Sequence, residues 1–312
     1  MKIFDMHADI GTDCLNHKDI ENCLEQRHLS KLAKGEIKGV FSACYFEGTE
    51  SWEIMQEMIL NMNKQIVLNK DSVRQVLTKE DLIEDDKLLD VISVEGMCGI
   101  DRDYENRIKW MYEHGVRVAI MAWNESNALC DGWTHDPTRG LTEAGELVVK
   151  TMNDLNMIID VSHLNEKSFW DVVRLSKKPI IASHSDYRGL CGHERNLTRQ
   201  QAIAIAKSGG LIGLNAAKSM VNVDEDKKTV DYLAKHARAY ADLVGVEHIA
   251  CGFDFMDFLE DWVVNGSPMV KGLESADKAQ SLIEALKNEG FTQEEIEMIA
   301  YKNVFNFLKN NL

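Results

Sequence analysis

Eight short apolar runs recur along the chain, and they limit its fold more than any other feature. Each run is about four to eight residues long, rich in Val, Ile and Ala, and not strictly alternating in polarity. The runs are residues 2–8, 39–46, 90–96, 117–124, 157–163, 179–185, 210–216 and 248–254. Near-continuous apolar strands are typical of a parallel sheet that is covered on both faces.

Amphipathic stretches separate these runs and are predicted to be helices. Residues 166–176, for example, place Phe169, Val172 and Val173 on one face at helical spacing. The predicted helices are 51–69, 103–114, 141–155, 166–176, 198–208, 226–244 and 274–289, followed by two further helices within 292–311. Segment 10–38 is polar and is expected to be helix or long loop.

Alternation of eight strands with helices predicts an α/β fold, a (β/α)₈ TIM barrel with extra C-terminal helices. An open doubly wound sheet is the alternative. The sequence has neither G-x-G-x-x-G nor G-x-x-x-x-G-K-[ST], the usual nucleotide-binding loops of such sheets. With three prolines and no Ser/Gly-rich linker, residues 1–312 are expected to form a single domain.

Composition limits the partners. A net charge of −16 makes nucleic acid and anionic membrane surfaces poor partners. The start, MKIFDMHADI, lacks the features of a signal peptide, and no apolar run reaches the roughly 18 residues of a membrane span. Seven scattered cysteines without a C-x-x-C pair predict reduced thiols in a cytoplasmic protein, not disulfides or a cysteine zinc site. A C₂ homodimer is the expected form of any self-association.

Residues that bind metals fall at the ends of the predicted strands. Active sites of TIM barrels form at the carboxyl ends of their strands. His7 and Asp9 are two residues apart, so both side chains point to the same side of the first strand. The full set is His7, Asp9, Glu95, His163, His184 and Asp254.

Three histidines and three carboxylates at one rim predict a metal site. Imidazole and carboxylate suit zinc, with manganese and cobalt as alternatives. Five ligands are too many for one open tetrahedral site, but they suffice for two ions about 3.5–4 Å apart if Glu95 bridges them. A water shared by two cations would ionise near neutral pH and become a nucleophile.

The sequence around these residues resembles the renal (membrane) dipeptidase family of zinc metallopeptidases, which belongs to the amidohydrolase-like barrel group. The similarity covers most of the chain. It includes DMHADI at 5–10, ISVEG at 92–96, the block from Gly140 to Val172, PIIASHSDYRGLCGHERNLT at 179–198, and GFDF at 252–255.

The resemblance implies a role for each matching residue. His7 and Asp9 would hold one zinc ion, His163 and His184 the other, and Glu95 would bridge them. Asp254 would be the catalytic acid/base, and Arg195 would bind the carboxylate of a dipeptide, as a guanidinium fork can.

The activity that this resemblance implies is hydrolysis of dipeptides, including those with a D-configured C-terminal residue, by a hydroxide bridging two zinc ions. One position departs from the family. Trp123 stands where a histidine stabilises the carbonyl oxygen in the mammalian pattern, and Asn124 is the neighbouring candidate donor. Trp carries no positive charge, and losing an oxyanion donor costs roughly a hundredfold in rate.

Two other functions remain open. Trp123 favours a related hydrolase that acts on a different small amide, ester or lactone. A non-catalytic metal-binding or ligand-binding barrel is disfavoured because all five ligands and Asp254 are present. Cys98 and Cys191 lie close in sequence to Glu95 and Arg195, and both are expected to be packing residues.

Overall fold

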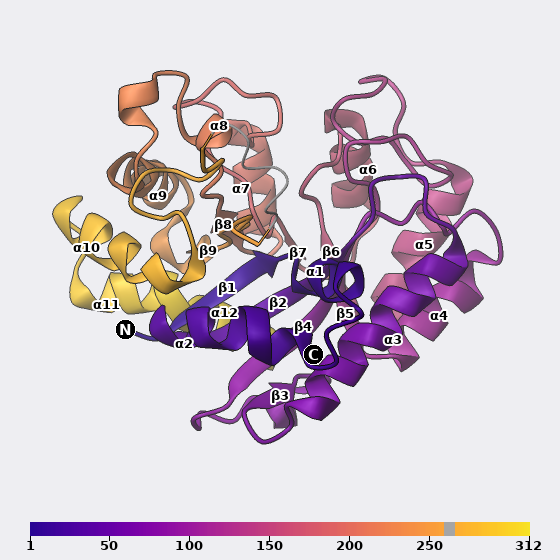
Figure 1. The fold of residues 1–312 in the computed structure, drawn as a ribbon. Helices are drawn as coiled ribbons and strands as arrows, with labels where there is room; N and C mark the ends of the chain where they lie inside the picture. The colour runs from indigo at the N-terminus through magenta and orange to yellow at the C-terminus, as the bar shows by residue number, and fades with distance from the viewer. Residues whose placement is uncertain (259–265) are drawn as a thin grey trace.

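The computed structural model describes residues 1–258 and 266–312. Its main sheet is a nearly closed barrel of parallel strands that follow one another in chain order (Figure 1). The barrel strands are β1 (Ile3–Ala8), β2 (Ile37–Tyr45), β4 (Leu88–Glu95), β5 (Val116–Ile120), β6 (Ile158–Asp160), β7 (Ile180–Ile181), β8 (Ile212–Leu214) and β9 (Ile249–Cys251). A bridge between Ala182 and Ile212 joins β7 to β8 and closes the ring. The predicted (β/α)₈ barrel is therefore confirmed, and all eight predicted strands are present.

One strand was not predicted. β3 (Val73–Gln75) pairs in parallel with β4, off the path of the barrel. At three residues it is too short to show any periodicity, so hydrophobic patterning does not predict it.

Helices surround the strands, with α3, α4 and α5 on one side in Figure 1 and α9, α10 and α11 on the other. The α-helices are α1 (Ile10–Asn16), α2 (Ser30–Lys34), α3 (Trp52–Leu68), α4 (Tyr104–Glu113), α5 (Glu143–Asp154), α6 (Glu166–Leu175), α7 (Arg199–Lys207), α8 (Lys218–Val221), α9 (Val230–Val244), α10 (Gln280–Asn288), α11 (Gln293–Glu297) and α12 (Asn303–Asn311). The shorter helices are η1 (Leu24–Leu29), η2 (Lys79–Asp81), η3 (Glu225–Lys227), η4 (Val246–His248), η6 (Ala276–Lys278) and η7 (Met298–Lys302). Side chains of Thr142, Asn165 and Thr198 cap the starts of α5, α6 and α7, which satisfies backbone N–H groups there.

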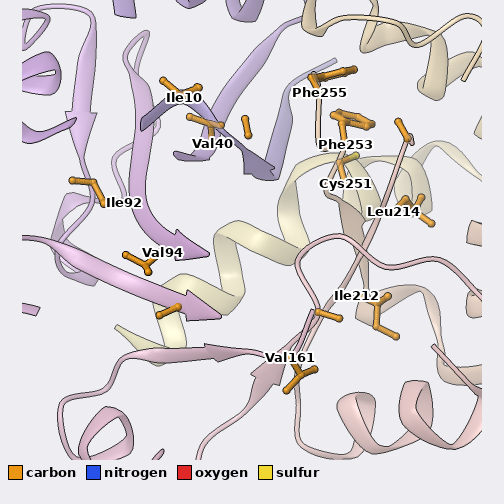
Figure 2. Close-up of a cluster of buried hydrophobic side chains, with 14 of the residues drawn as sticks. Ile10, Val40, Ile92, Val94, Val161, Ile212, Leu214, Cys251, Phe253 and Phe255 are labelled. Carbon is orange, nitrogen blue, oxygen red and sulfur yellow. The ribbon is translucent and has the colours of Figure 1, made fainter. Parts of the chain in front are cut away.

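Buried apolar side chains form two clusters, one on each face of the barrel wall. The first packs the strands against the surrounding helices, and Figure 2 shows members from different strands, including Val94, Ile212 and Cys251. The second takes side chains from all eight strand regions and fills the barrel interior. Val304, Phe307 and Leu308 of α12 join this second cluster, so the C-terminal helix closes one end of the barrel. A functional site is therefore expected at the opposite end of the barrel.

Segment 10–38 contains three short helices, α1, η1 and α2, between β1 and β2. The first of them, α1, begins at the residue directly after Asp9. Within residues 1–258 and 266–312, no helix is long and apolar enough to cross a bilayer.

Candidate metal centre and substrate cavity

The six side chains predicted from the strand ends lie together at the carboxyl end of the barrel. His163 Nε2 and His184 Nε2 lie 2.9 and 3.4 Å from Glu95 Oε1. His7 Nε2 lies 3.2 Å from the second oxygen of Glu95 and 3.5 Å from Asp9 Oδ1. It also lies 3.9 Å from Asp254 Oδ1. Glu95 is therefore at the centre of the cluster, with imidazoles facing both of its oxygens.

The residues of this cluster fit divalent cations. His7 Nε2, Asp9 Oδ1 and Glu95 Oε1 are buried and have no hydrogen-bond partner among the described residues. Buried polar atoms are nearly always paired, so three such atoms in one place indicate a bound ion. Two overlapping groups each bring three ligand atoms within 4.8 Å of one another: His7 with Glu95 and His184, and His7 with Asp9 and Asp254. Nitrogen and carboxylate donors of this kind suit zinc, manganese or cobalt.

Neighbouring side chains orient two of the imidazoles. His163 Nδ1 lies 2.9 Å from Asn124 Oδ1, which also accepts a hydrogen bond from Trp133 Nε1 at 2.5 Å. His184 Nδ1 lies 2.7 Å from Ser183 Oγ. These contacts direct both Nε2 atoms toward Glu95, as is usual for histidines that bind metals.

His163 and Asp254 have left-handed backbone conformations, with φ of 67° and 59°. Such values are uncommon outside glycine, and they cluster at functional sites where the surrounding structure holds them. The backbone N–H of Asp254 donates to the carbonyl of His7 at 3.2 Å, which joins the ends of β9 and β1.

Two glycines make room for the chain that carries His184. A Cβ atom on Gly213 would lie 1.8 Å from the carbonyl oxygen of Ser183, and one on Gly252 would lie 1.7 Å from it. Any side chain at either position would therefore displace Ser183 and the adjacent His184.

Side chains add to the backbone hydrogen bonds beyond the two residues of β7, where the N–H groups of Ala182 and Ser185 still donate to the carbonyls of Leu211 and Gly213. Asp160 Oδ1 accepts from the backbone N–H of Ser162 at 2.9 Å and of Ser183 at 3.1 Å. The N–H of His184 donates to Ser162 Oγ at 3.4 Å, and Asp186 Oδ1 accepts from the N–H of Asn215 at 3.2 Å. Polar side chains thus fix the chain beyond β7.

The pKa values of the ionisable groups in the centre shift in different directions. Burial, helped by the charges of Asp9 and Glu95, raises the pKa of Asp254 to about 8. Burial also lowers the pKa of His163 to about 4, with the charge of Arg195 acting in the same direction. Burial opposes ionisation of Glu95, but the charges of His7 and His163 prevail and hold its pKa well below its usual range. The neutral imidazole of His163 beside an ionised carboxylate is ready to bind a cation. At His7 the charges of Glu95 and Asp9 outweigh burial and raise the pKa well above its usual range, so this imidazole would release a proton when a cation binds.

Two adjoining cavities reach this centre and share His163 and Trp133 in their walls. The larger, about 580 Å³, is lined by Asp9, Glu95, Trp123, Asn124 and Asp254 among others. The smaller, about 490 Å³, contains Arg195. The predicted ligands and the predicted carboxylate-binding residue therefore open onto neighbouring spaces.

Arg195 is buried beside His184. Its Nη1 donates to Ser185 Oγ at 2.7 Å and its Nη2 to the carbonyl of His184 at 3.0 Å. Its Nε is buried without a hydrogen-bond partner among the described residues. This leaves N–H groups available to an anionic ligand.

The structure places Trp123 and Asn124 differently from each other. The ring of Trp123 packs edge-on against Tyr45, with centroids 5.0 Å apart, in the wall of the larger cavity. The side-chain oxygen of Asn124 contacts Nδ1 of His163, the ring nitrogen that does not face Glu95. This orienting contact was not predicted, and neither was the role of Asn215, whose Nδ2 donates to Asp254 Oδ2 at 3.3 Å. Asn215 is the penultimate residue of the run 210–216 and directly follows β8, so its strand-end position was the available signal.

Among the described residues, neither Cys98 nor Cys191 hydrogen-bonds to an imidazole. Cys98 Sγ donates to the carbonyl of Glu50 and Cys191 Sγ to that of Ser219, both at 3.5 Å. Burial raises the pKa of Cys98 to about 12. These contacts are those of packing residues.

Comparison with known families decides the relationship. The model of the membrane dipeptidase family, peptidase family M19, matches residues 1–311. The chain belongs to this family. The resemblance seen in the sequence is confirmed, and membership of this M19 metallopeptidase family makes the protein a hydrolase of the dipeptidase type with a divalent metal centre.

Relatives of this M19 protein include an uncharacterized protein and a protein named as a dipeptidase. The uncharacterized protein in the pqqA 5′ region of Klebsiella pneumoniae is 30% identical over 270 residues, which cover 83% of this chain and 96% of that protein. Dipeptidase tcpJ of Claviceps purpurea is 30% identical over 198 residues, which cover 62% of this chain and 44% of that protein.

Solved structures show the same M19 fold. The metallopeptidase of Rhodobacter sphaeroides, crystallised with a phosphinate mimic of the dipeptide L-Ala-D-Ala, superimposes with a TM-score of 0.86 at 22% identity. The superposition covers 100% of this chain and 99% of that one.

Proposed function

We propose that this M19 protein is a dipeptidase, built as a single domain, that binds two zinc-class ions at the strand ends. The observation that carries the proposal is the convergence of His7, Asp9, Glu95, His163 and His184 around buried atoms that have no hydrogen-bond partner in residues 1–258 and 266–312. The ions would supply a water of lowered pKa and polarise the scissile carbonyl.

The ligands divide into two pairs around Glu95. His7, which also contacts Asp9, lies near one oxygen of Glu95, and His163 and His184 lie near the other. A carboxylate that uses both oxygens in this way can bridge two cations. This arrangement supports two ions rather than one.

Asp254 is the proposed proton carrier. Its carboxyl is buried next to His7 and is held by Asn215. A group whose pKa lies near neutrality can take the proton of the attacking water and deliver it to the leaving amine. The charge of bound cations opposes the effect of burial and favours the ionised form that accepts this proton.

Arg195 is the proposed anchor of the substrate's C-terminal carboxylate. It lies in the smaller cavity, and the larger cavity reaches Asp254. A dipeptide whose carboxylate pairs with Arg195 would extend past His163 toward the metal centre. The phosphinate mimic of L-Ala-D-Ala bound by the Rhodobacter sphaeroides metallopeptidase supports a D-configured residue at this end.

Hydrolysis of a dipeptide panel tests the proposal. Purified protein is assayed on L-Ala-L-Ala, L-Ala-D-Ala and Gly-D-Phe with added zinc, after chelation, and after zinc is restored. Cleavage that follows zinc and is absent in His163→Ala is expected. Absence of cleavage of every peptide by protein that retains about two ions per chain would refute the dipeptidase proposal.

Trp123 favours a second candidate, a hydrolase of the same metal centre acting on a different small amide, ester or lactone. Its ring lines the larger cavity, where the mammalian pattern has a histidine. The variant Trp123→His discriminates the two. A gain of about tenfold or more in dipeptide hydrolysis would show that the wild-type cavity is adapted to another substrate.

A further inference from the structure

A second group of metal-binding side chains lies between α1 and η1, outside the centre described above. Cys14, Cys23 and His28 are all buried, and their ligand atoms lie within 4.8 Å of one another. Cys14 belongs to α1, Cys23 directly precedes η1, and His28 belongs to η1. The fold brings together two cysteines that are nine positions apart, which a search for C-x-x-C pairs does not detect.

A carboxylate adjoins this group. Asp13 Oδ2 lies 2.7 Å from His28 Nε2 and 3.9 Å from Cys23 Sγ. Arg27 holds the same carboxylate, with Nε 2.7 Å from Oδ2 and Nη2 3.1 Å from Oδ1. Two sulfur atoms and one imidazole therefore meet at a single buried point, and the carboxylate contacts the imidazole and one of the two sulfur atoms.

These donors match the coordination chemistry of zinc. Structural zinc sites are four-coordinate and combine cysteine sulfur with histidine nitrogen, and carboxylate oxygen is also a zinc ligand. The charges balance as well. Two thiolates and Asp13 carry three negative charges, which one divalent ion and Arg27 neutralise. Burial of such a site costs little because no net charge remains.

We propose that Cys14, Cys23 and His28, together with the carboxylate of Asp13, form a structural binding site for a zinc-class ion, separate from the strand-end centre. The site would fasten α1 to η1. Because α1 follows Asp9 and its residues Thr12 and Leu15 line the larger cavity, the ion would stabilise one wall of that cavity. Arg27 Nη2 also donates to the carbonyl of Phe258 at 3.1 Å, which connects the site to the loop after β9.

Cadmium spectroscopy tests this site independently of activity. Metal-free, reduced protein is titrated with Cd²⁺, and the ultraviolet thiolate-to-cadmium charge-transfer band is followed. The strand-end centre contains only nitrogen and oxygen ligands, so the band reports the cysteine site alone. Wild-type protein is expected to show a band whose final amplitude corresponds to one thiolate-bound ion per chain, while total bound Cd²⁺ rises to about three ions per chain because the strand-end centre also fills.

Two serine variants provide the comparison. Cys23→Ser should lose most of the band, and Cys98→Ser, which alters a thiol outside the group, should retain it. An unchanged band in Cys23→Ser would overturn the proposal. So would wild-type protein that shows no band while its thiols remain reactive, or one in which Cys14 and Cys23 form a disulfide and bind no Cd²⁺ after reduction.

A third variant covers the case in which Cys23→Ser does not fold, as judged by circular dichroism. His28→Gln retains both thiolates and removes one ligand. It should keep a band but bind Cd²⁺ at least tenfold more weakly than wild type. Equal affinity would exclude His28 as a ligand and refute the site as proposed.

Discussion

His163 Nδ1 lies 2.9 Å from the side-chain oxygen of Asn124, and this contact determines which nitrogen of the imidazole faces the metal centre. An amide oxygen only accepts, so Nδ1 carries the proton and Nε2 presents its lone pair toward Glu95. Trp133 donates to the same oxygen and holds the amide in this orientation. Asn124 thus orients a proposed ligand.

Removing this acceptor should weaken metal binding. Asn124→Ala is expected to lower affinity for zinc by about ten- to a hundredfold, because His163 loses its orienting partner. Asn124→Asp keeps an acceptor and should stay close to wild type. Competition with a chromophoric chelator measures both. Equal affinities in Asn124→Ala and wild type would contradict the orienting role.

Arg195 should distinguish substrates by their C-terminal charge. Arg195→Lys loses the guanidinium fork and is expected to raise KM for dipeptides by about ten- to a hundredfold, the value of charged hydrogen bonds. The corresponding dipeptide amides lack the carboxylate and should be affected much less. Steady-state kinetics on matched acid and amide pairs checks this. An equal effect on both would place Arg195 in a purely structural role.

A methyl group at position 252 should disturb the centre without touching its ligands. Gly252→Ala places a Cβ against the carbonyl oxygen of Ser183, and overpacking of this kind costs about 1–3 kcal/mol. Lower unfolding free energy and weaker zinc binding are both expected. Gly192→Ala is the matched control, since a Cβ there meets no atom within 4 Å. Equal stability of the two variants would show that Ser183 can move freely.

Asp90 should make stability depend on pH. Burial raises its pKa from 3.8 to about 7, and among the described residues its carboxylate accepts a hydrogen bond from Ser42 alone. Between about pH 4 and pH 7 the folded state binds the extra proton, so the unfolding free energy falls as pH rises and stays reduced above pH 7.

The variant Asp90→Asn removes this dependence. Its stability relative to wild type should rise by roughly 3 kcal/mol from pH 4 to pH 8. Denaturant unfolding at several pH values measures the difference, with the surface variant Asp154→Asn as control. A difference that does not change with pH would show that Asp90 ionises normally in the folded protein.

The barrel, and the position of the proposed ligands at its rim, were predictable from sequence because both depend on short-range order. Apolar runs define strands, and the last residues of each run mark a strand end, so His7, Glu95 and His184 could be placed at one rim. The contact of Asn124 with His163 was not predictable, since it joins residues 39 positions apart.

Other features escaped the sequence for different physical reasons. Gly252 looks like an ordinary glycine until the position of Ser183 is known. β3 is too short for a periodic pattern. Cys14 and Cys23 meet only because segment 10–38 folds into short helices, which its polar composition did not determine.

The side chains that hydrogen-bond to the backbone beyond β7 have a consequence for protein engineering. Asp160, Ser162 and Asp186 contribute no predicted ligand, yet Asp160 and Ser162 hold the backbone that presents His184, and Asp186 holds that of Asn215 beside Asp254. Grafting the metal-binding residues alone onto another barrel would leave that backbone without these hydrogen bonds. A functional graft would have to include these three residues, so the smallest transferable site contains more residues than the metal ligands and Asp254.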